Sequence, residues 1–341
     1  MRAYFIGSVN AKSAEEVISA IAERAGDVTQ YIPDGETGDR KDWFEWQVQV
    51  LARAPQLEGI GEQTLLQDYV TFARFRMRDG VTADDLQLGP LGYADAATAS
   101  YQIFRRLKGE GRIRSQVRFL VSLPTAVAVT FGYLEEGQTA FEKGYERHLL
   151  AEIGAMTKNI PVSELAIQWD VAVEMGMLEG VFPTYIGGDL LSEVCERLGR
   201  LGDAVPPDVA LGYHLCYGNR GNEHFREPDD TGTLVQVANG LTARCHRSIE
   251  WIHMPVPIER DDDAYFEPLR GLALQSSTEL VLGLLHKEDG LAGAARRMAA
   301  ARRAVGDFAV AAECGLGREP ADAIDGLLDL HAEACRELGL G

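Results

Sequence analysis

The segment Leu211-Gly212-Tyr213-His214-Leu215-Cys216-Tyr217-Gly218 is an apolar run that ends with a histidine and a cysteine two positions apart. Residues i and i+2 of a strand point to the same side, so we expect the imidazole of His214 and the thiol of Cys216 to face one point. These two groups would make half of a tetrahedral zinc site. Cys314 ends another apolar run, and it is the expected third ligand.

The segment around His214 is one of eight short apolar runs that are typical of strands, and helical patterns separate most of them. The expected strands lie near residues 3, 29, 118, 166, 210, 250, 281 and 309. Strands that alternate with helices indicate a parallel sheet, and eight repeats favour a closed (β/α)8 barrel, or TIM barrel, over an open doubly wound sheet. No break in composition divides the chain, so we expect one α/β domain over residues 1–341.

Residues 54–92 do not fit this alternation. They contain several glycines and a proline, and their periodicity is weak. We expect an irregular insertion after the second strand–helix unit, with a small strand or two. Such an insertion could act as a lid, a subunit contact or a donor site.

Serine, carboxylate, histidine and cysteine residues that could bind a ligand or take part in catalysis lie where the expected strands end. They are Ser8, Asp34, Glu36, Asp170, His214, Cys216, His253, His286 and Cys314. Active sites of (β/α)8 barrels lie at the C-terminal ends of the strands, so we expect these side chains to share one face of the barrel. A single buried cysteine is more often a packing residue than a ligand, and the zinc hypothesis therefore depends on the combination.

Composition excludes several classes of partner. The net charge of −19 argues against a nucleic-acid surface, which needs a basic patch, and against an anionic membrane surface. The sequence has no run of about 18 apolar residues that would span a membrane. The five cysteines are odd in number and irregularly spaced, which indicates a reducing cytoplasm rather than a disulfide framework.

The spaced motifs resemble those of the cobalamin-independent methionine synthases, in particular their C-terminal catalytic barrel. The matching motifs are Ile6-Gly7-Ser8, Gly35-Glu36, Ile167-Gln168-Trp169-Asp170, His214-Leu215-Cys216-Tyr217, Leu285-His286 and Cys314-Gly315-Leu316, the last followed by Arg318. The resemblance spans residues 6 to 318. The wider superfamily includes uroporphyrinogen decarboxylase.

This resemblance implies a zinc-dependent methyltransferase that acts on a small thiol such as homocysteine. Ser8 would hold the carboxylate of the amino acid. Glu36 and Asp170 would bind its amino group. His286, at the end of the seventh strand, would be the acid, so His286 and Asp170 are the expected catalytic residues.

The chain also departs from the family pattern. The family's fourth ligand is a glutamate at the end of the sixth strand, where this sequence has His253. Three alternatives follow: His253 binds zinc, the site has three protein ligands, or Glu250 binds through a shift in register. In addition, Val171 and Ala172 follow Asp170, whereas the family has Glu-Pro.

The methyl donor is open, because the family's full-length enzyme uses a second barrel to help bind its folate and this chain is too short for one. The donor could be a folate bound differently, a methylated corrinoid protein or a small methylated compound. A lyase or decarboxylase on the same barrel is the main alternative, with zinc polarising a carbonyl and Trp43, Trp46 and Trp169 lining the pocket. A non-catalytic protein with a closed four-ligand zinc site is another. Glu36 and Asp170 could also be structural residues that cap helices or pair with an arginine.

Overall fold

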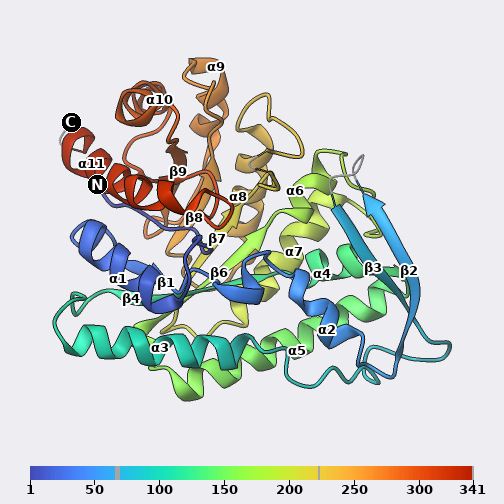
Figure 1. Cartoon of the computed structure of the whole chain (residues 1–341). Coiled ribbons are helices and arrows are strands. Elements are labelled where there is room, and N and C mark those ends of the chain that lie inside the picture. The colour runs from blue at the N-terminus through green and yellow to red at the C-terminus, as the bar shows by residue number, and fades with distance from the viewer. Residues whose placement is uncertain (66–69, 222, 340–341) are drawn as a thin grey trace.

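The computed structural model describes residues 1–65, 70–221 and 223–339. Seven parallel strands form the main sheet, in the order β1-β4-β6-β7-β8-β9-β10. Their bounds are Tyr31–Pro33 (β1), Arg118–Pro124 (β4), Leu165–Val171 (β6), Ala210–Leu215 (β7), Trp251–Pro255 (β8), Glu279–Leu285 (β9) and Ala309–Ala312 (β10). Figure 1 shows the sheet curling round, with helices on its outer side.

The first residues of the chain fill the gap between β10 and β1. Ala3 forms a parallel bridge with Val310 of β10, and Ser8 forms one with Gly35, just beyond β1. The backbone amide of Tyr4 donates to the carbonyl of Val310 at 2.9 Å. All eight expected strand positions are thus occupied, and the prediction of a TIM-like α/β barrel is confirmed.

The inside of the barrel is packed with side chains from all eight segments. This cluster consists of Tyr4, Ile6, Tyr31, Leu120, Ala166, Ala210, Trp251, Val281, Ala309 and Ala311. Small alanines on several strands leave space for the large ring of Trp251. Gly212 of β7 leaves space as well, because a Cβ there would lie 1.8 Å from a carbon of the Trp251 ring. The barrel interior is therefore a solid core, as in other barrels of this type.

Amphipathic helices cover the outer side of the sheet (Figure 1). The longer helices are Ala14–Ala25 (α1), Tyr93–Gly109 (α3), Gln138–Asn159 (α5), Leu190–Asp203 (α7), Gly232–Arg244 (α8), Gly290–Ala304 (α10) and Ile324–Leu338 (α11). Shorter ones are Val48–Leu51 (α2), Ala126–Tyr133 (α4), Val173–Leu178 (α6) and Asp263–Phe266 (α9), and the 3-10 turns are Gly38–Arg40 (η1), Glu45–Gln47 (η2), Val162–Glu164 (η3), Glu267–Gly271 (η4) and Ala321–Ala323 (η5). Across the described ranges, no helix is both long and apolar enough to cross a membrane.

The segment 54–92 is more regular than the sequence indicates. It contains the antiparallel hairpin of β2 (Leu57–Leu65) and β3 (Val70–Met77), and β3 also pairs with β5 (Leu134–Glu136) in a separate three-stranded sheet. Arg74 of β3 is buried, and its guanidinium donates to the carbonyls of Phe131, Gly132 and Leu134 at 2.7 to 2.8 Å. These bonds attach the hairpin to the end of α4, beside the barrel (Figure 1).

Candidate functional site

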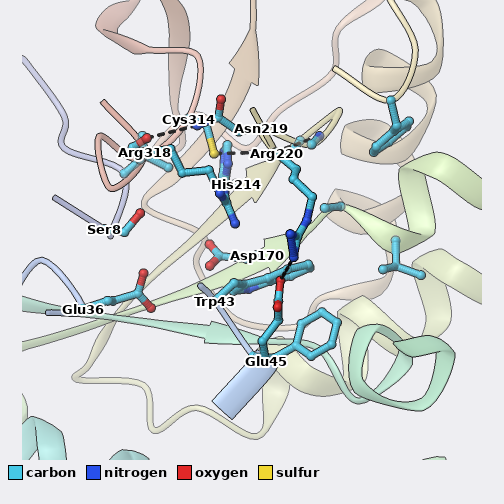
Figure 2. A pocket seen from close by; sticks show the side chains of 18 of the residues that line it. Ser8, Glu36, Trp43, Glu45, Asp170, His214, Asn219, Arg220, Cys314 and Arg318 are labelled. Carbon is cyan, nitrogen blue, oxygen red and sulfur yellow. Dashed lines mark hydrogen bonds and ion pairs between the residues drawn. The ribbon is translucent and has the colours of Figure 1, made fainter. Parts of the chain in front are cut away.

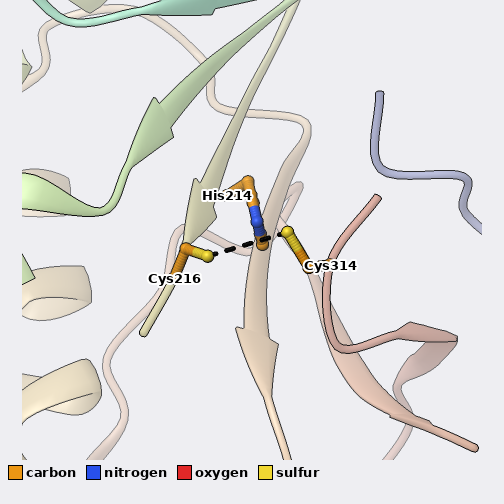
Figure 3. Close-up of side chains that lie close together, drawn as sticks. All are labelled: His214, Cys216 and Cys314. Carbon is orange, nitrogen blue, oxygen red and sulfur yellow. Dashed lines mark hydrogen bonds between the residues drawn. The ribbon is translucent and has the colours of Figure 1, made fainter. Parts of the chain in front are cut away.

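His214, Cys216 and Cys314 lie together at the C-terminal face of the barrel, as the sequence predicts. His214 is the second-last residue of β7, Cys216 follows that strand, and Cys314 follows β10. Their ligand atoms all lie within 4.8 Å of one another, and the two Sγ atoms are 3.8 Å apart (Figure 3). Two sulfurs bound tetrahedrally to one zinc ion, each at about 2.3 Å, would be about 3.8 Å apart. The spacing therefore fits a metal held by both cysteines.

The histidine of this group has a nitrogen that lacks a partner. His214 is 3% exposed, and its Nε2 has no hydrogen-bond partner within the described residues. Buried polar atoms are nearly always paired, so a missing partner at this position needs an explanation. A metal ion between Nε2 and the two sulfurs would supply it. Three protein ligands with a fourth position left open are typical of catalytic sites.

His253 lies behind His214 and orients it. The two residues are register partners on β7 and β8, and their Nδ1 atoms are 2.7 Å apart. The other nitrogen of His253, Nε2, lies 3.0 Å from the carbonyl oxygen of Ala312, which can only accept a hydrogen bond. Burial holds the pKa of His253 well below its usual range, so the ring is neutral. Its Nδ1 must then accept a hydrogen bond from the N–H at Nδ1 of His214, which leaves the lone pair of His214 on Nε2.

This arrangement bears on the three alternatives for the fourth ligand. Both ring nitrogens of His253 have partners, so neither is available to a metal. His253 instead orients His214. Glu250 does not reach the site either, because it precedes β8 and accepts a hydrogen bond from the amide of Leu211 at 2.6 Å. Of the three alternatives, the one with three protein ligands fits the described residues.

Glu36 and Asp170 line the same cavity as the three ligands. Burial raises the pKa of Glu36 to about 8, and burial together with the charge of Glu36 raises the pKa of Asp170 well above its usual range. Arg40 does not neutralise Glu36 by direct contact, because it pairs with Asp34 at 2.6 Å. The structural alternative of an arginine partner therefore applies to Asp34 and not to Glu36.

Backbone strain also gathers at this cavity. Among the described residues other than glycine, only Glu36 and Trp43 have a positive φ, 49° and 57°. Both side chains line the cavity (Figure 2). A bulky residue rarely adopts this conformation, and strained residues cluster at functional sites.

Ser8 lies beside the glycines that follow Cys314. The backbone amide of Leu316 donates to the carbonyl of Ser8, and a Cβ at Gly315 would lie 2.4 Å from the Ser8 hydroxyl oxygen. The glycine in the Cys-Gly-Leu motif thus permits two loops to meet. Ser8 and Arg318 both line the cavity as a result (Figure 2).

His286 does not line the cavity. Its Nε2 is 2.9 Å from the carbonyl oxygen of Val256, and its Nδ1 is 3.6 Å from a carboxylate oxygen of Glu313. Burial lowers the pKa of His286 to about 4, so the ring carries no proton to spare at neutral pH. Its expected role as an acid remains a prediction, without support from this geometry.

Trp43, which the sequence places in the pocket, does line the cavity, but the rest of the apolar side was not expected from the sequence. The cavity has a volume of about 130 Å³. Six aromatic side chains line that side, and we call them the aromatic wall: Trp43, Phe44, Phe72, Phe131, Phe182 and Phe225. Several follow strand ends, so the rule that located the polar residues could have located these as well. Trp46 and Trp169, which the sequence places in such a pocket, do not line it: Trp46 packs on Tyr93, and Trp169 is fully buried.

An ion pair between Arg220 and Glu45 lies at the cavity (Figure 2). Arg220 lies in the segment after β7, and Glu45 begins η2. Both residues line the cavity. The pair connects two strand-end segments that are 175 residues apart in the chain.

No protein-family model matches this chain, and no curated protein matches its sequence. Among solved structures, that of a B12-independent methionine synthase from Shewanella sp. W3-18-1 in complex with selenomethionine is similar to it. The match covers 99% of this chain and 98% of that chain, with a TM-score of 0.65 and 12% sequence identity. At that identity the likeness concerns the fold, and it confirms the expected resemblance to the barrel of these enzymes.

Proposed function

We propose that this protein is a zinc-dependent enzyme that transfers a methyl or other alkyl group to the sulfur of a small thiol such as homocysteine. The observation that carries the proposal is the group of His214, Cys216 and Cys314, whose unpartnered Nε2 and two sulfurs converge beside a cavity. Nitrogen and sulfur ligands favour zinc over the harder divalent ions. The fold likeness to a methionine synthase structure supports the same reading.

The zinc ion, when bound, supplies Lewis acidity that keeps the substrate sulfur a nucleophilic thiolate at neutral pH. Two cysteine thiolates and one neutral imidazole leave the site with a net charge near zero. His253 holds the His214 ring in the tautomer that this ligand set needs.

Ser8, Glu36 and Asp170 position the amino acid part of the thiol substrate. Ser8 binds its carboxylate, and Arg318, which lines the cavity as well, adds a positive charge there. The substrate ammonium group binds Glu36, which is partly buried, and Asp170, which is buried, and neither has a cation in direct contact among the described residues. An ammonium group in this position favours the charged form of each carboxyl and so offsets the cost of burying it.

The remaining expectations extend this proposal. We propose that the chain works as one domain and that the β2–β3 hairpin acts as a lid, since Phe72 of β3 lines the cavity. All five cysteines are free, and the site needs two of them reduced, which supports a reducing compartment such as the cytoplasm.

Zinc-edge X-ray absorption with and without homocysteine tests the proposal. The purified protein should contain about one zinc per chain, with two sulfur ligands that become three when homocysteine is added. Cys216→Ser should remove the metal, whereas Cys195→Ser, at a buried cysteine near Val237, should keep it. A folded protein without zinc would contradict the proposal. Two sulfurs that stay two would favour a lyase or decarboxylase, a reaction that needs no thiol.

A further inference from the structure

The aromatic wall has no role in the function proposed above. Its rings form two contiguous groups. Phe131 stacks on Phe182 with ring centroids 4.9 Å apart, and Phe182 lies 4.8 Å from Phe225. Trp43 and Phe44, at 4.6 Å, continue to Phe72 at 5.7 Å from Phe44.

The chain holds these rings firmly. Gly176 gives Phe182 its place, because a Cβ at Gly176 would lie 2.4 Å from the Phe182 ring. Gly132 does the same for Phe44, at 2.7 Å. Phe44, Phe72 and Phe182 are buried, whereas Phe131, Phe225 and Trp43 keep part of their surface exposed. The wall is thus a preformed surface with ring area available to a ligand.

Aromatic faces bind two kinds of ligand well: flat apolar groups and methylated cations. The two kinds of ligand differ as alkyl donors. A neutral ether or amine needs a proton on the atom that leaves, whereas a methylated cation leaves as a neutral molecule without one. Among the described residues that line the cavity, His214 is the one histidine, there is no tyrosine, and Lys41 is the one lysine. His286 lies outside, and the proposed function assigns Glu36 and Asp170 to the amino group of the thiol. Lys41 is thus the one unassigned proton donor of the lining, and the shortage of such donors favours a leaving group that departs without a proton.

We propose that the alkyl donor is a small methylated onium compound, a sulfonium or quaternary ammonium ion, whose cationic centre rests against the aromatic wall. This inference rests on the function proposed above. The thiol first releases its proton to solvent. Its sulfur then forms a bond to a methyl carbon of the donor, and the bond from that carbon to the cationic sulfur or nitrogen breaks. The leaving atom keeps the electron pair and departs as a neutral thioether or tertiary amine, so charge and protons balance.

A pair of ligands with one shape separates charge from size. Choline and 3,3-dimethylbutan-1-ol differ mainly in the charged nitrogen of choline. With the zinc-loaded protein and homocysteine, we expect calorimetry to show at least about ten-fold tighter binding of choline. Equal affinity for the neutral alcohol, or tighter binding of a neutral methyl aryl ether such as anisole, would overturn the inference.

Two leucine variants test the wall itself. Phe72→Leu and Phe225→Leu keep apolar volume but remove the ring, and each should weaken choline binding by about two- to thirty-fold with little effect on the alcohol. Phe75→Leu is the matched control, because Phe75 is buried on the same strand and packs on Tyr133 outside the cavity. Equal losses in Phe72→Leu and Phe75→Leu would indicate a general effect on folding and contradict a role for the wall.

Turnover completes the test. With trimethylsulfonium and homocysteine, mass spectrometry should detect methionine and dimethyl sulfide in equal amounts. No methionine above the protein-free rate would overturn the inference. The two proposals fail differently: if homocysteine adds no sulfur to the zinc, the proposed function fails, whereas if it does and choline has no advantage, only the donor class is wrong.

Discussion

The two ends of the barrel both place partly buried carboxylates beside a cavity, but their surroundings differ. At the N-terminal end, around a cavity of about 660 Å³, Glu279 accepts hydrogen bonds from Tyr4 at 2.6 Å and from Arg2 at 3.0 Å. Glu250 there accepts one from the amide of Leu211. At the C-terminal end, the pKa of Glu36 is raised by burial, and no hydrogen bond to its carboxyl is found among the described residues.

This difference separates stability from function. A carboxylate with hydrogen-bond partners fixes the fold, because the partners offset the cost of taking charge out of water. A partly buried carboxyl without partners, in the same cavity as an unpartnered imidazole nitrogen, costs stability and is retained where a ligand completes it. The N-terminal end thus supports the barrel, and the C-terminal end is prepared for a ligand.

The largest effect is expected from the metal ligands. Cys216→Ser and Cys314→Ser should each lower zinc affinity by more than about 100-fold, because substitutions behind the ligands already cost 10- to 100-fold in such sites. Competition with a colorimetric zinc chelator measures this. Retained zinc in both variants would contradict the inference that the C-terminal end is prepared for a ligand.

His253→Gln should have the next largest effect, a loss of about 10- to 100-fold in zinc affinity, because His214 would lose the partner that fixes its tautomer. His331→Gln is a matched control. His331 is also buried and bonded at both nitrogens, to the carbonyl of Leu327 at 2.7 Å and the amide of Ala312 at 3.2 Å. Similar zinc losses in the two variants would mean that His253 acts only through packing.

Glu36→Gln should change how stability depends on pH. The folded-state pKa of about 8 lies above the ordinary 4.5, so the folded protein holds this proton more tightly than the unfolded chain does. The contribution to stability is complete below pH 4.5 and is lost as pH rises to about 8. Thermal unfolding of the substrate-free protein should therefore show Glu36→Gln gaining on wild type between these pH values. Parallel curves would contradict the raised pKa.

The smallest effect is expected at the opposite end. Tyr4→Phe removes the hydrogen bond to Glu279 and should cost about 1 to 2 kcal/mol of unfolding free energy, since Arg2 still reaches that carboxylate. Urea denaturation measures the loss. Zinc content and turnover should stay at wild-type values, and a change in either would show that the two ends are coupled.

Local patterns explain which features could be predicted from the sequence. A strand reveals itself through a short apolar run, and the strand-end rule then brings His214, Cys216 and Cys314 to one face. The role of His253 needed the register of β7 against β8, which puts its ring beside His214 rather than beside the sulfurs. No periodicity within one strand carries that information.

The attachment of the hairpin and the full aromatic wall depend on the fold for a related reason. The strand-end rule points to single rings such as Trp43, and it does not say which rings meet. In the sequence, Arg74 is a charged residue that interrupts an apolar pattern. It can be buried because backbone carbonyls 57 to 60 residues later accept hydrogen bonds from its guanidinium. The six rings of the wall come from separate segments between residues 43 and 225. Only the closed barrel brings these segments together.

The hydrogen bond from His253 to Ala312 has a further consequence for how the proposed metal site would be loaded. A free imidazole in water can hold its proton on either nitrogen, so some encounters with a metal ion would meet the protonated nitrogen. Here a backbone carbonyl, two hydrogen bonds away, keeps that proton on the far side of His214. The neutral ring thus presents Nε2 to the metal without a change of tautomer, and each cysteine ligand releases its proton from sulfur on loading.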